Sequence, residues 1–260
     1  MTPPDDETKD PGYPNDPAFR SPLFSYGDPA FLAAMSLWHE TMPPPDEHPN
    51  SELIRTALES AEKFLKPFPN NKLYRASPRR YSNRNDSLSG FGSQLHGGRF
   101  NPPRSFRIVY LSIDPSTPHA EMKKAEARKA EGLADFPLAP VEELEARFPL
   151  ATVQAHLEKV LDLTDEEVLA LPKFVEAGID RLFLTRDGWI RDAVVVTEFA
   201  TQAVGRIAYD LGWHGLITHS SADGGEKNLD VFVGNLSIGF GLQILEPKDF
   251  PSHWRKTAPK

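Results

Sequence analysis

The chain has 260 residues and a formal net charge of −8, and its length suits one large domain or one domain with a substantial extension. Its 39% hydrophobic and 25% charged residues are typical of a soluble globular protein, and the absence of cysteine excludes disulfides, thiolate catalysis and cysteine-ligated metals. No apolar run approaches the roughly 20 residues that span a bilayer, and the N-terminus lacks the basic and apolar regions of a signal peptide, so we expect a cytoplasmic protein.

The charge is unevenly distributed along the chain. Residues 1–70 hold 12 acidic and 5 basic residues. In residues 71–107, by contrast, eight lysines and arginines accompany a single acid, Asp86. Such a basic segment suits an anionic ligand, because guanidinium groups pair with phosphate oxygens in a fixed fork. A solvated basic loop explains the charge equally well.

The first 70 residues are predicted to be a proline-rich acidic tail followed by a helical extension. Residues 1–28 combine prolines with scattered acids, a composition that favours an irregular chain. Apolar residues recur at helical spacing over 29–41 and 51–66, and Pro67 stops the second of these predicted helices. We expect this extension to pack on the main domain, residues 71–260.

From residue 72 onward, strand and helix patterns are mixed. Runs rich in β-branched and aromatic residues predict strands, at 73–76, 108–113, 151–163, 192–196, 215–218, 228–234 and 241–245. Helical spacing predicts helices, at 119–131, from 164 onward and at 198–211. Residues 82–98 are rich in Ser, Asn and Gly and are predicted to form a loop. Because strands and helices do not alternate regularly, the sequence favours an α+β fold over a doubly wound sheet.

Three common catalytic or metal-binding signatures are weak or missing. The glycine-rich stretch 90–97 lacks the Gly-Lys-Ser/Thr ending of a phosphate loop, and no helix is predicted after it. No Gly-x-Ser-x-Gly motif occurs, which argues against an α/β-hydrolase triad. The eight histidines are scattered, so we interpret them as surface or packing residues rather than as metal ligands.

Four residues stand out as candidates for a shared site. Arg75 lies near the end of a predicted strand, and Arg99 follows two glycines. Glu121 falls in the first turn of a predicted helix, and Ser221 lies where a strand runs into a glycine-rich turn. Taken singly, each has a structural explanation: a surface arginine, an arginine that braces its own loop, a glutamate favoured by the helix dipole and a turn serine.

Taken together, these residues follow an ordered pattern. The chain resembles the RES domain family, which is named for its Arg, Glu and Ser residues, over residues 72–246. The motifs that carry the resemblance follow the family's order: Tyr74-Arg75, Gly97-Gly98-Arg99-Phe100-Asn101, Tyr110-Leu111-Ser112, Ala120-Glu121 and Ser220-Ser221-Ala222. The Gly-Gly-Arg-aromatic-Asn stretch is the most specific of them.

The resemblance implies a fold, an activity and a partner. RES proteins are bacterial toxins of toxin–antitoxin pairs with a fold like that of ADP-ribosyltransferase toxins, so we expect mixed, twisted sheets with flanking helices. They consume NAD+ by hydrolysis or phosphorolysis at the nicotinamide–ribose bond, and some are described as transferring ADP-ribose to a protein. An Xre-like antitoxin usually neutralises them by covering the active site.

The chain departs from the family pattern in three places. Phe100 stands where tryptophan is commoner, and either ring can brace the turn. The segment between Glu121 and Ser221 is long, which leaves both Ser220 and Ser221 as candidates for the family's serine. Residues 1–70 lie outside the pattern and leave open how an antitoxin binds.

The resemblance and the chemistry of NAD+ cleavage together assign roles to the charged residues. Breaking the nicotinamide–ribose bond builds positive charge on the ribose, and Glu121 is the carboxylate that would stabilise it. Arg75 and Arg99 would pair with the two phosphates. Ser221 would orient the nicotinamide ribose or the carboxamide. NAD+ is the substrate, and this chemistry requires no metal.

Glycines and tyrosines complete the predicted substrate site. Gly97 and Gly98 would let the backbone approach the ligand and present N–H groups to it. Tyr110 would stack on the nicotinamide, and Tyr74 would line the same wall.

Three functions follow from these residues. An NAD+ glycohydrolase or phosphorylase is the favoured one. An ADP-ribosyltransferase acting on a protein or nucleic acid would break the same bond and differ only in the acceptor. A non-enzymatic nucleic-acid or interaction module would use the basic segment, but the acidic chain and the lack of a recognised nucleic-acid motif count against it.

Overall fold

The computed structural model describes residues 44–69, 71–77, 87–131, 147–185, 197–220, 222, 225–237, 239 and 241–245. The described elements lie in one compact unit, which begins at Pro45. The predicted helix at 29–41, the predicted strand at 192–196 and Ser221 fall outside the described residues. Within these ranges, no helix is long and apolar enough to cross a membrane.

Helices and strands are mixed along the chain, so the predicted α+β class is confirmed. The strands are β1 (Lys66–Phe68), β2 (Lys72–Ala76), β3 (Ile108–Ser112), β4 (Leu150–Asp162), β5 (Gly215–His219), β6 (Lys227–Phe232) and β7 (Gly241–Ile244). The α-helices are α3 (Ser51–Ser60), α5 (Phe91–His96), α6 (Thr117–Glu131), α8 (Glu166–Leu169), α9 (Pro172–Ala177), α10 (Arg181–Thr185) and α11 (Ala200–Asp210). Each predicted strand that falls within the described residues is present, with bounds that differ by one or two residues.

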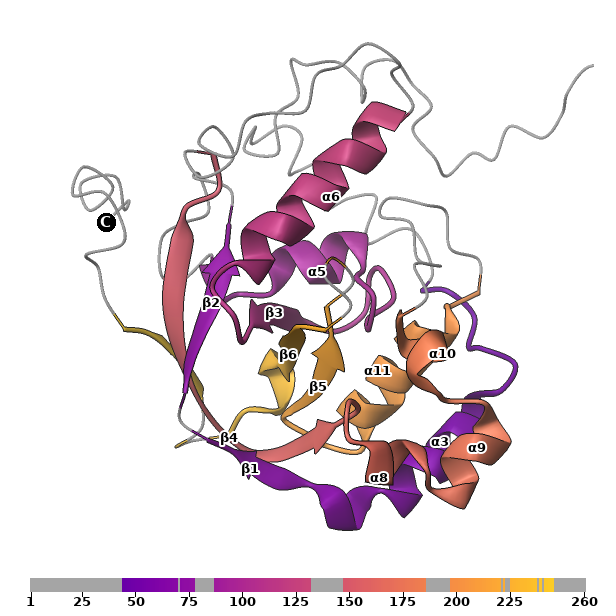
Figure 1. Ribbon diagram of the computed structural model, residues 1–260. Coiled ribbons are helices and arrows are strands. Elements are labelled where there is room, and N and C mark those ends of the chain that lie inside the picture. The colour runs from indigo at the N-terminus through magenta and orange to yellow at the C-terminus, as the bar shows by residue number, and fades with distance from the viewer. Residues whose placement is uncertain are drawn as a thin grey trace, which may run out of the picture. The chain divides into compact units, whose positions relative to one another are not determined.

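The strands form one sheet that bends back on itself (Figure 1). Its order is β1-β4-β2-β3-β6-β5, and β7 also pairs with β4. The 13-residue strand β4 organises the sheet, because its first half pairs with β2 and β7 and its second half with β1 and β5. The β4–β5 pair is parallel and the other pairs are antiparallel. Since β5 pairs with both β6 and β4, the strands β4, β2, β3, β6 and β5 form a closed circuit.

Two hydrophobic cores lie on opposite faces of this sheet, as the alternation of side chains along β3 shows. Val109 and Leu111 belong to the core formed mainly by strand residues. Ile108 belongs to the other core, and Tyr110 packs against it. Helices α3, α9 and α11 cover this second core (Figure 1). The helix-covered face of β3 is therefore the face that carries Tyr110.

The predicted helix at 51–66 is shorter than expected. It ends at Ser60, and after a 3-10 turn (Glu62–Phe64) the chain forms strand β1. Pro67 is tolerated there because β1 stands at the edge of the sheet order. Phe64 and Leu65 both pack on the helix-covered core, which explains why their apolar spacing extended the predicted helix too far.

The predicted loop at 82–98 contains helix α5, which the sequence analysis missed. The helix begins after Gly90, whose φ of +65° lies in the left-handed region. The Ser93 hydroxyl donates to the carbonyl of Ile108 and accepts from its N–H, so α5 is fixed to the start of β3. Glycine and serine have low helix propensity, and here contacts with the sheet override it.

A buried ion pair connects α11 to the start of α3. Arg206 donates to both carboxylate oxygens of Glu198 at 2.7–3.2 Å and to the Ser51 hydroxyl at 3.1 Å. The Glu198 side chain is 2% exposed and also accepts from the His48 backbone N–H. Hydrogen bonding to Glu198 raises the pKa of Arg206, so the guanidinium stays charged. Helix α3 thus shares the core of the residues that follow it, while the domain boundary at residue 70 stays a prediction.

We expect Arg206→Ala to destabilise the fold strongly, because it leaves Glu198 buried without its cation. Removing one partner of a buried pair costs about 3–5 kcal/mol, and chemical denaturation measures the loss. The control is Arg55→Ala, which removes a pair with Asp210 at 3.6 Å between side chains that are 32% and 43% exposed. That change should cost less than about 1 kcal/mol. Equal losses for the two variants would contradict the prediction.

Candidate active site

Glu121 on α6 is held by donors from two neighbouring strands. The Ser220 hydroxyl, directly after β5, and the Asn228 side-chain amide, on β6, each donate to Glu121 Oε1 at 2.8 Å. The other oxygen, Oε2, receives no hydrogen bond from the described residues. Glu121 is half-buried. The carboxylate is therefore oriented by the protein and keeps one oxygen for a ligand.

Glu121 lies deeper in its helix than the sequence predicted. Helix α6 begins at Thr117, so Glu121 is its fifth residue and lies in the second turn rather than the first. The stabilising effect of the helix dipole falls off within the first turn. Contacts with the strands, rather than the helix terminus, account for the position of this carboxylate.

The loop 97–101 is closed by its own backbone and supported by two side chains. Gly98 N–H donates to Asn101 O at 2.8 Å. The Tyr110 hydroxyl donates to Asn101 Oδ1 at 2.9 Å and accepts from Phe100 N–H at 3.1 Å. Gln202 on α11 donates to the carbonyls of Gly98 and Asn101 at 3.0 and 3.2 Å. Burial raises the pKa of Tyr110, so its hydroxyl remains a donor, and its stacking on nicotinamide stays a prediction.

Glycines allow this loop to fit between β3 and α11. Gly97 has a φ of +70°, in the left-handed region that favours glycine. A Cβ on Gly98 would lie 2.3 Å from the Tyr110 hydroxyl oxygen. On the helix side, a Cβ on Gly205 would lie 1.7 Å from Phe100 O. The packing of the loop thus requires these glycines, and the approach of the Gly97 and Gly98 backbone to a ligand stays a prediction.

Arg99 is buried, with 7% of its surface exposed, and its guanidinium connects three segments of the chain. Nη1 donates to His219 O, at the end of β5, at 2.8 Å, and Nη2 donates to Leu184 O on α10. The guanidinium carbon also lies 5.3 Å from the centroid of the Phe100 ring. This geometry agrees with an arginine that braces its loop, while its contact with a phosphate stays a prediction.

Arg75 supports the junction between β2 and β3. The two strands pair at Tyr74 and Ser112, and Arg75 Nη1 donates to Tyr110 O at 2.7 Å. Arg75 Nε is buried without a hydrogen-bond partner among the described residues, and burial lowers the pKa of Arg75 to about 10. Tyr74 lies opposite Ser112, on the sheet face that also carries Tyr110. The unpaired Nε–H is a donor that suits an anionic ligand.

Two polar residues of this site, Asn228 and Asp230, were missed by the sequence analysis. Both lie on β6, where Asp230 stands opposite Tyr110 and accepts from the Thr218 hydroxyl at 3.0 Å. Asp230 is 1% exposed, and burial raises the pKa of its carboxyl to about 7 although Arg99 acts to lower it. In the sequence these polar residues alternate with apolar ones inside a predicted strand, a pattern that solvent-facing residues of a strand share.

Of the two adjacent serines, the structure describes Ser220. Its side chain is buried, and besides donating to Glu121 it accepts from Ala222 N–H at 3.2 Å. Ser221 lies outside the described residues, so its role in orienting the substrate stays a prediction. Ser220 is therefore the described serine that contacts the glutamate, and the choice between Ser220 and Ser221 as the family's serine stays a prediction.

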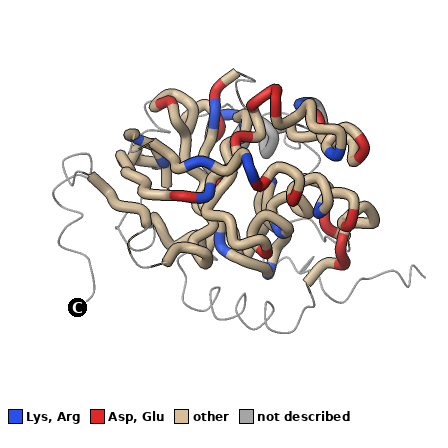
Figure 2. The backbone as a smooth tube through the Cα atoms, turned by 90° about the horizontal axis from the view of Figure 1, so that it is seen from below, with Lys and Arg blue, Asp and Glu red and all other residues tan. Residues whose placement is uncertain are grey.

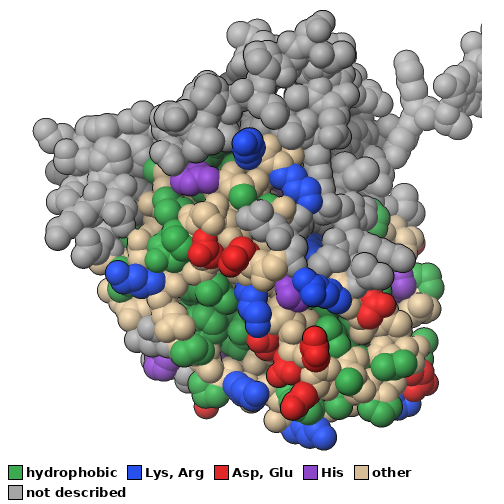
Figure 3. Space-filling view, viewed as in Figure 1, with side chains coloured by type: hydrophobic (Ala, Val, Ile, Leu, Met, Phe, Trp, Pro, Cys, Tyr) green, Lys and Arg blue, Asp and Glu red, His purple; other side chains and the backbone are tan. Residues whose placement is uncertain are grey.

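The basic segment 71–107 is not a solvated loop throughout. Among its described cations, Arg99 is buried at the site and Arg75 donates to the Tyr110 carbonyl, whereas Lys72 and Arg107 are exposed. Basic and acidic residues are interspersed along the rest of the described chain (Figure 2) and on the face shown in Figure 3. Among the described residues, no group of three or more His, Asp or Glu could hold a metal ion.

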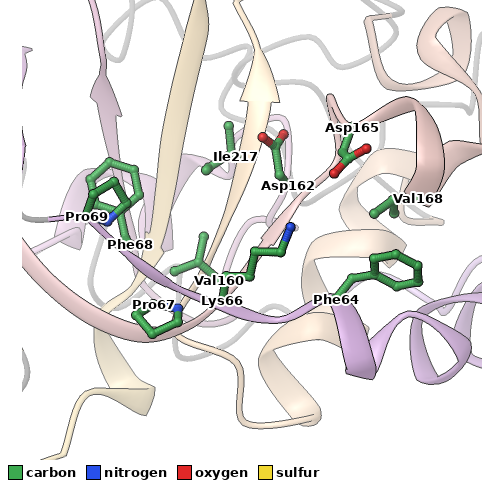
Figure 4. Close-up of a pocket in the computed structure, with 10 residues that line it drawn as sticks. All are labelled: Phe64, Lys66, Pro67, Phe68, Pro69, Val160, Asp162, Asp165, Val168 and Ile217. Atoms are coloured by element: carbon green, nitrogen blue, oxygen red, sulfur yellow. The ribbon is translucent and has the colours of Figure 1, made fainter.

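A surface hollow elsewhere contains none of the predicted site residues. It lies beside β1, β4 and α8, and the side chains of Lys66, Asp162 and Asp165 stand among apolar ones around it (Figure 4). The residues that line it are Phe64, Lys66, Pro67, Phe68, Pro69, Val160, Asp162, Asp165, Val168 and Ile217. Two carboxylates on its wall make it a poor receptor for an anionic dinucleotide.

Comparison with known proteins identifies relatives and a shared fold. The sequence model of the RES domain matches residues 72–246. Proteins named NAD(+) phosphorylase MbcT, from Mycobacterium bovis and Mycobacterium tuberculosis, are 32% identical over 133 residues, which is 51% of this chain and 60% of theirs. The chain thus spans about 60% of the length of these curated relatives. The crystal structure of the M. tuberculosis MbcT–MbcA toxin–antitoxin complex contains a chain of similar fold, with a TM-score of 0.54 and 20% identity, covering 75% of this chain and 90% of that one.

We expect Arg99→Ala to lower the stability of the fold, because it removes two hydrogen bonds that a charged group makes in the interior. Such bonds contribute about 1.5–3 kcal/mol each, so urea denaturation should show a loss of roughly 3 kcal/mol or more. The control is Arg107→Ala, an exposed arginine whose Nε donates to Gln94 at 3.0 Å, and its loss should stay below about 1 kcal/mol. An Arg99→Ala variant as stable as the wild type would show that the bracing role is wrong.

Proposed function

This chain belongs to the RES domain family, and we propose that it is a toxin-like enzyme that cleaves the nicotinamide–ribose bond of NAD+. The observation that carries the proposal is the carboxylate of Glu121, whose Oε1 accepts hydrogen bonds from Ser220 and Asn228 at 2.8 Å. Relatives named NAD(+) phosphorylase support the same substrate and the same bond. Depletion of NAD+ would be the toxic effect.

The reaction needs electrostatic stabilisation more than it needs an acid. When the bond between ribose C1 and the pyridine nitrogen breaks, its electron pair stays on the nitrogen, so nicotinamide leaves as a neutral molecule without taking a proton. Positive charge then develops on the ribose, as in glycoside cleavage, and a neighbouring carboxylate stabilises it. Ser220 and Asn228 hold Glu121 before the charge appears, so little reorganisation is needed as the reaction proceeds.

Phosphate or water completes the reaction. In phosphorolysis, a phosphate oxygen forms the new bond to ribose C1; in hydrolysis, water forms it and releases a proton. The name of the relatives favours phosphate as the acceptor. Transfer of ADP-ribose to a macromolecule would use the same cleavage step and is the alternative outcome.

The two arginines would bind the pyrophosphate of the dinucleotide. Arg75 offers a buried Nε–H that has no partner among the described residues, and phosphate oxygens are acceptors. Arg99 would contribute mainly its charge, since its terminal nitrogens already donate to backbone carbonyls. The loop 97–101, to which Arg99 belongs, would carry the backbone N–H groups that approach the dinucleotide.

The proposed partner is an antitoxin protein. A structural neighbour of this chain was solved as the MbcT–MbcA toxin–antitoxin complex, which supports a partner of that kind. The finer assignment, an antitoxin of the Xre-like type, rests on the family resemblance. Such a partner would neutralise the enzyme by covering the approach to Glu121.

We expect the purified protein to release nicotinamide from NAD+, faster with phosphate than without it, as chromatography of the products would show. Glu121→Gln should lower the rate by about 10²–10³-fold, because an amide does not stabilise the developing positive charge. Glu226→Gln is the control: this exposed glutamate lies near Ser220 in the chain and should leave the rate within about twofold. A folded wild-type protein that releases no nicotinamide in either condition would refute the proposal.

We expect Ser220→Ala to slow nicotinamide release by roughly 10–100-fold, because Glu121 loses one charge-assisted hydrogen bond. Ser221→Ala, measured beside it, tests the role predicted for Ser221 in orienting the substrate. Full activity of Ser220→Ala together with loss of activity in Ser221→Ala would show that Ser221 is the functional serine of this chain.

A further inference from the structure

Two buried oxygen atoms on β6 have no hydrogen-bond donor among the described residues: Oδ1 of Asn228 and Oδ1 of Asp230. The two residues are two positions apart in the strand, so their side chains lie on the same face of the sheet. The other polar atom of each is already used. Asn228 Nδ2 donates to Glu121 at 2.8 Å, and Asp230 Oδ2 accepts from Thr218 at 3.0 Å.

The neighbours of these oxygens make their described hydrogen bonds elsewhere. On β3, Tyr110 stands opposite Asp230, but its hydroxyl donates to Asn101 Oδ1 at 2.9 Å. The terminal nitrogens of Arg99 donate to the carbonyls of His219 and Leu184. The sheet face next to Glu121 therefore presents two acceptors that the described residues leave unpaired.

Unpaired acceptors of this kind point to a ligand. Buried polar atoms are almost always hydrogen-bonded in native proteins, because an unpaired one has lost its water without compensation. The raised pKa of Asp230, about 7, agrees with a carboxylate whose charge is incompletely compensated by its surroundings. Donors supplied by a bound molecule would give both oxygens the hydrogen bonds that they lack.

We propose that Asn228 Oδ1 and Asp230 Oδ1 form a subsite for hydrogen-bond donors of the nicotinamide riboside half of NAD+. The proposal rests on the function proposed above. Donor chemistry excludes the phosphates, which are anionic acceptors that a carboxylate repels, but both halves of NAD+ carry donors: ribose hydroxyls on each, the carboxamide NH2 on one and the adenine amino group on the other. The choice of half follows from the contact with Glu121. The bond from Asn228 to Glu121 places the subsite beside the bond that breaks.

Asp230→Asn is the informative variant, because it replaces one hydrogen-bond acceptor of the side chain with a donor. The asparagine carbonyl can keep the bond from Thr218, which puts an NH2 group where the unpaired acceptor stood. In a Glu121→Gln background that leaves the dinucleotide intact, calorimetry should show NAD+ binding about tenfold or more weaker. The matched control, Asp210→Asn, changes an exposed carboxylate whose ion pairs with the described residues Arg55 and Arg206 are both 3.6 Å long, and should leave the affinity unchanged.

Two analogues identify the donor. One is 3-acetylpyridine adenine dinucleotide, which lacks the carboxamide NH2, and the other lacks the 2′-hydroxyl of the nicotinamide ribose. In the Glu121→Gln background, the analogue without the contacted donor should bind about tenfold more weakly than NAD+, and adding Asp230→Asn should abolish that difference. Asn228→Ser offers the same test if Asp230→Asn does not fold. If neither variant changes the difference in affinity between NAD+ and the analogues, the proposed subsite is wrong.

The pH dependence of binding is a second readout that a purely structural role would not produce. A bound donor favours the ionised carboxylate, so NAD+ binding should tighten as pH rises through the pKa of Asp230 and weaken below it. That pKa is about 7 in the wild type and lower in the Glu121→Gln background, because the charge of Glu121 helps to raise it. The other groups that face Asp230 are Arg99, Tyr110 and residue 121, which does not titrate in the Glu121→Gln background. Burial raises the pKa of Tyr110 and lowers that of His219 on β5, so both shift away from neutral pH. If the affinity for NAD+ still rises with pH in the Asp230→Asn variant, the result contradicts the proposal.

Failure of the subsite and failure of the proposed function give different results. If the wild type binds NAD+ more tightly than the analogues, as proposed, but releases no nicotinamide, the function is refuted and the subsite is retained. If the wild type cleaves NAD+ but Asp230→Asn and Asn228→Ser leave the affinity difference between NAD+ and the analogues unchanged, the subsite is refuted and the function is retained.

Discussion

The site depends on a positive charge that the fold keeps in its interior. Arg99 is 7% exposed, and its terminal nitrogens donate to the carbonyls of His219 and Leu184, which connects its loop to the end of β5 and to α10. Ser220 follows His219 directly and contacts Glu121. The same guanidinium lowers the pKa of Asp230 against the effect of burial. The position of the serine that contacts Glu121 and the pKa of Asp230 are thus both linked to this one side chain.

The closed circuit of strands explains how residues far apart in sequence meet there. Strand β4 pairs with β2 at one end and with β5 at the other, which bends the sheet until β3 and β6 complete the circuit. Side chains on one face of β3, β5 and β6 then converge beneath the start of α6. Because the apolar neighbours on these strands fill two cores, each strand has only one register in which its polar residues reach the site.

Local patterns predicted much of the fold and part of the site. The strands were foreseen because β-branched and aromatic runs mark them independently of their partners, as at β3. Helix α5 was missed because its glycine and serine content argues against a helix, and the bonds of Ser93 to β3 stabilise it nonetheless. Asn228 and Asp230 were missed because, inside an otherwise apolar strand, nothing in the sequence distinguishes a polar residue that faces a site from one that faces water.

The sequence by itself determined the α+β class, the order of the motifs and the residue types available for chemistry, since these depend on composition and on spacing along the chain. Only the tertiary structure decided which of them meet. It placed Ser220 and Asn228 on one oxygen of Glu121 and gave Arg99 backbone carbonyls as partners. It also left acceptors on β6 unpaired. The physical reason is that hydrogen bonds act over about 3 Å in space, whereas the residues that make these bonds are separated by 85 to 120 positions in the chain.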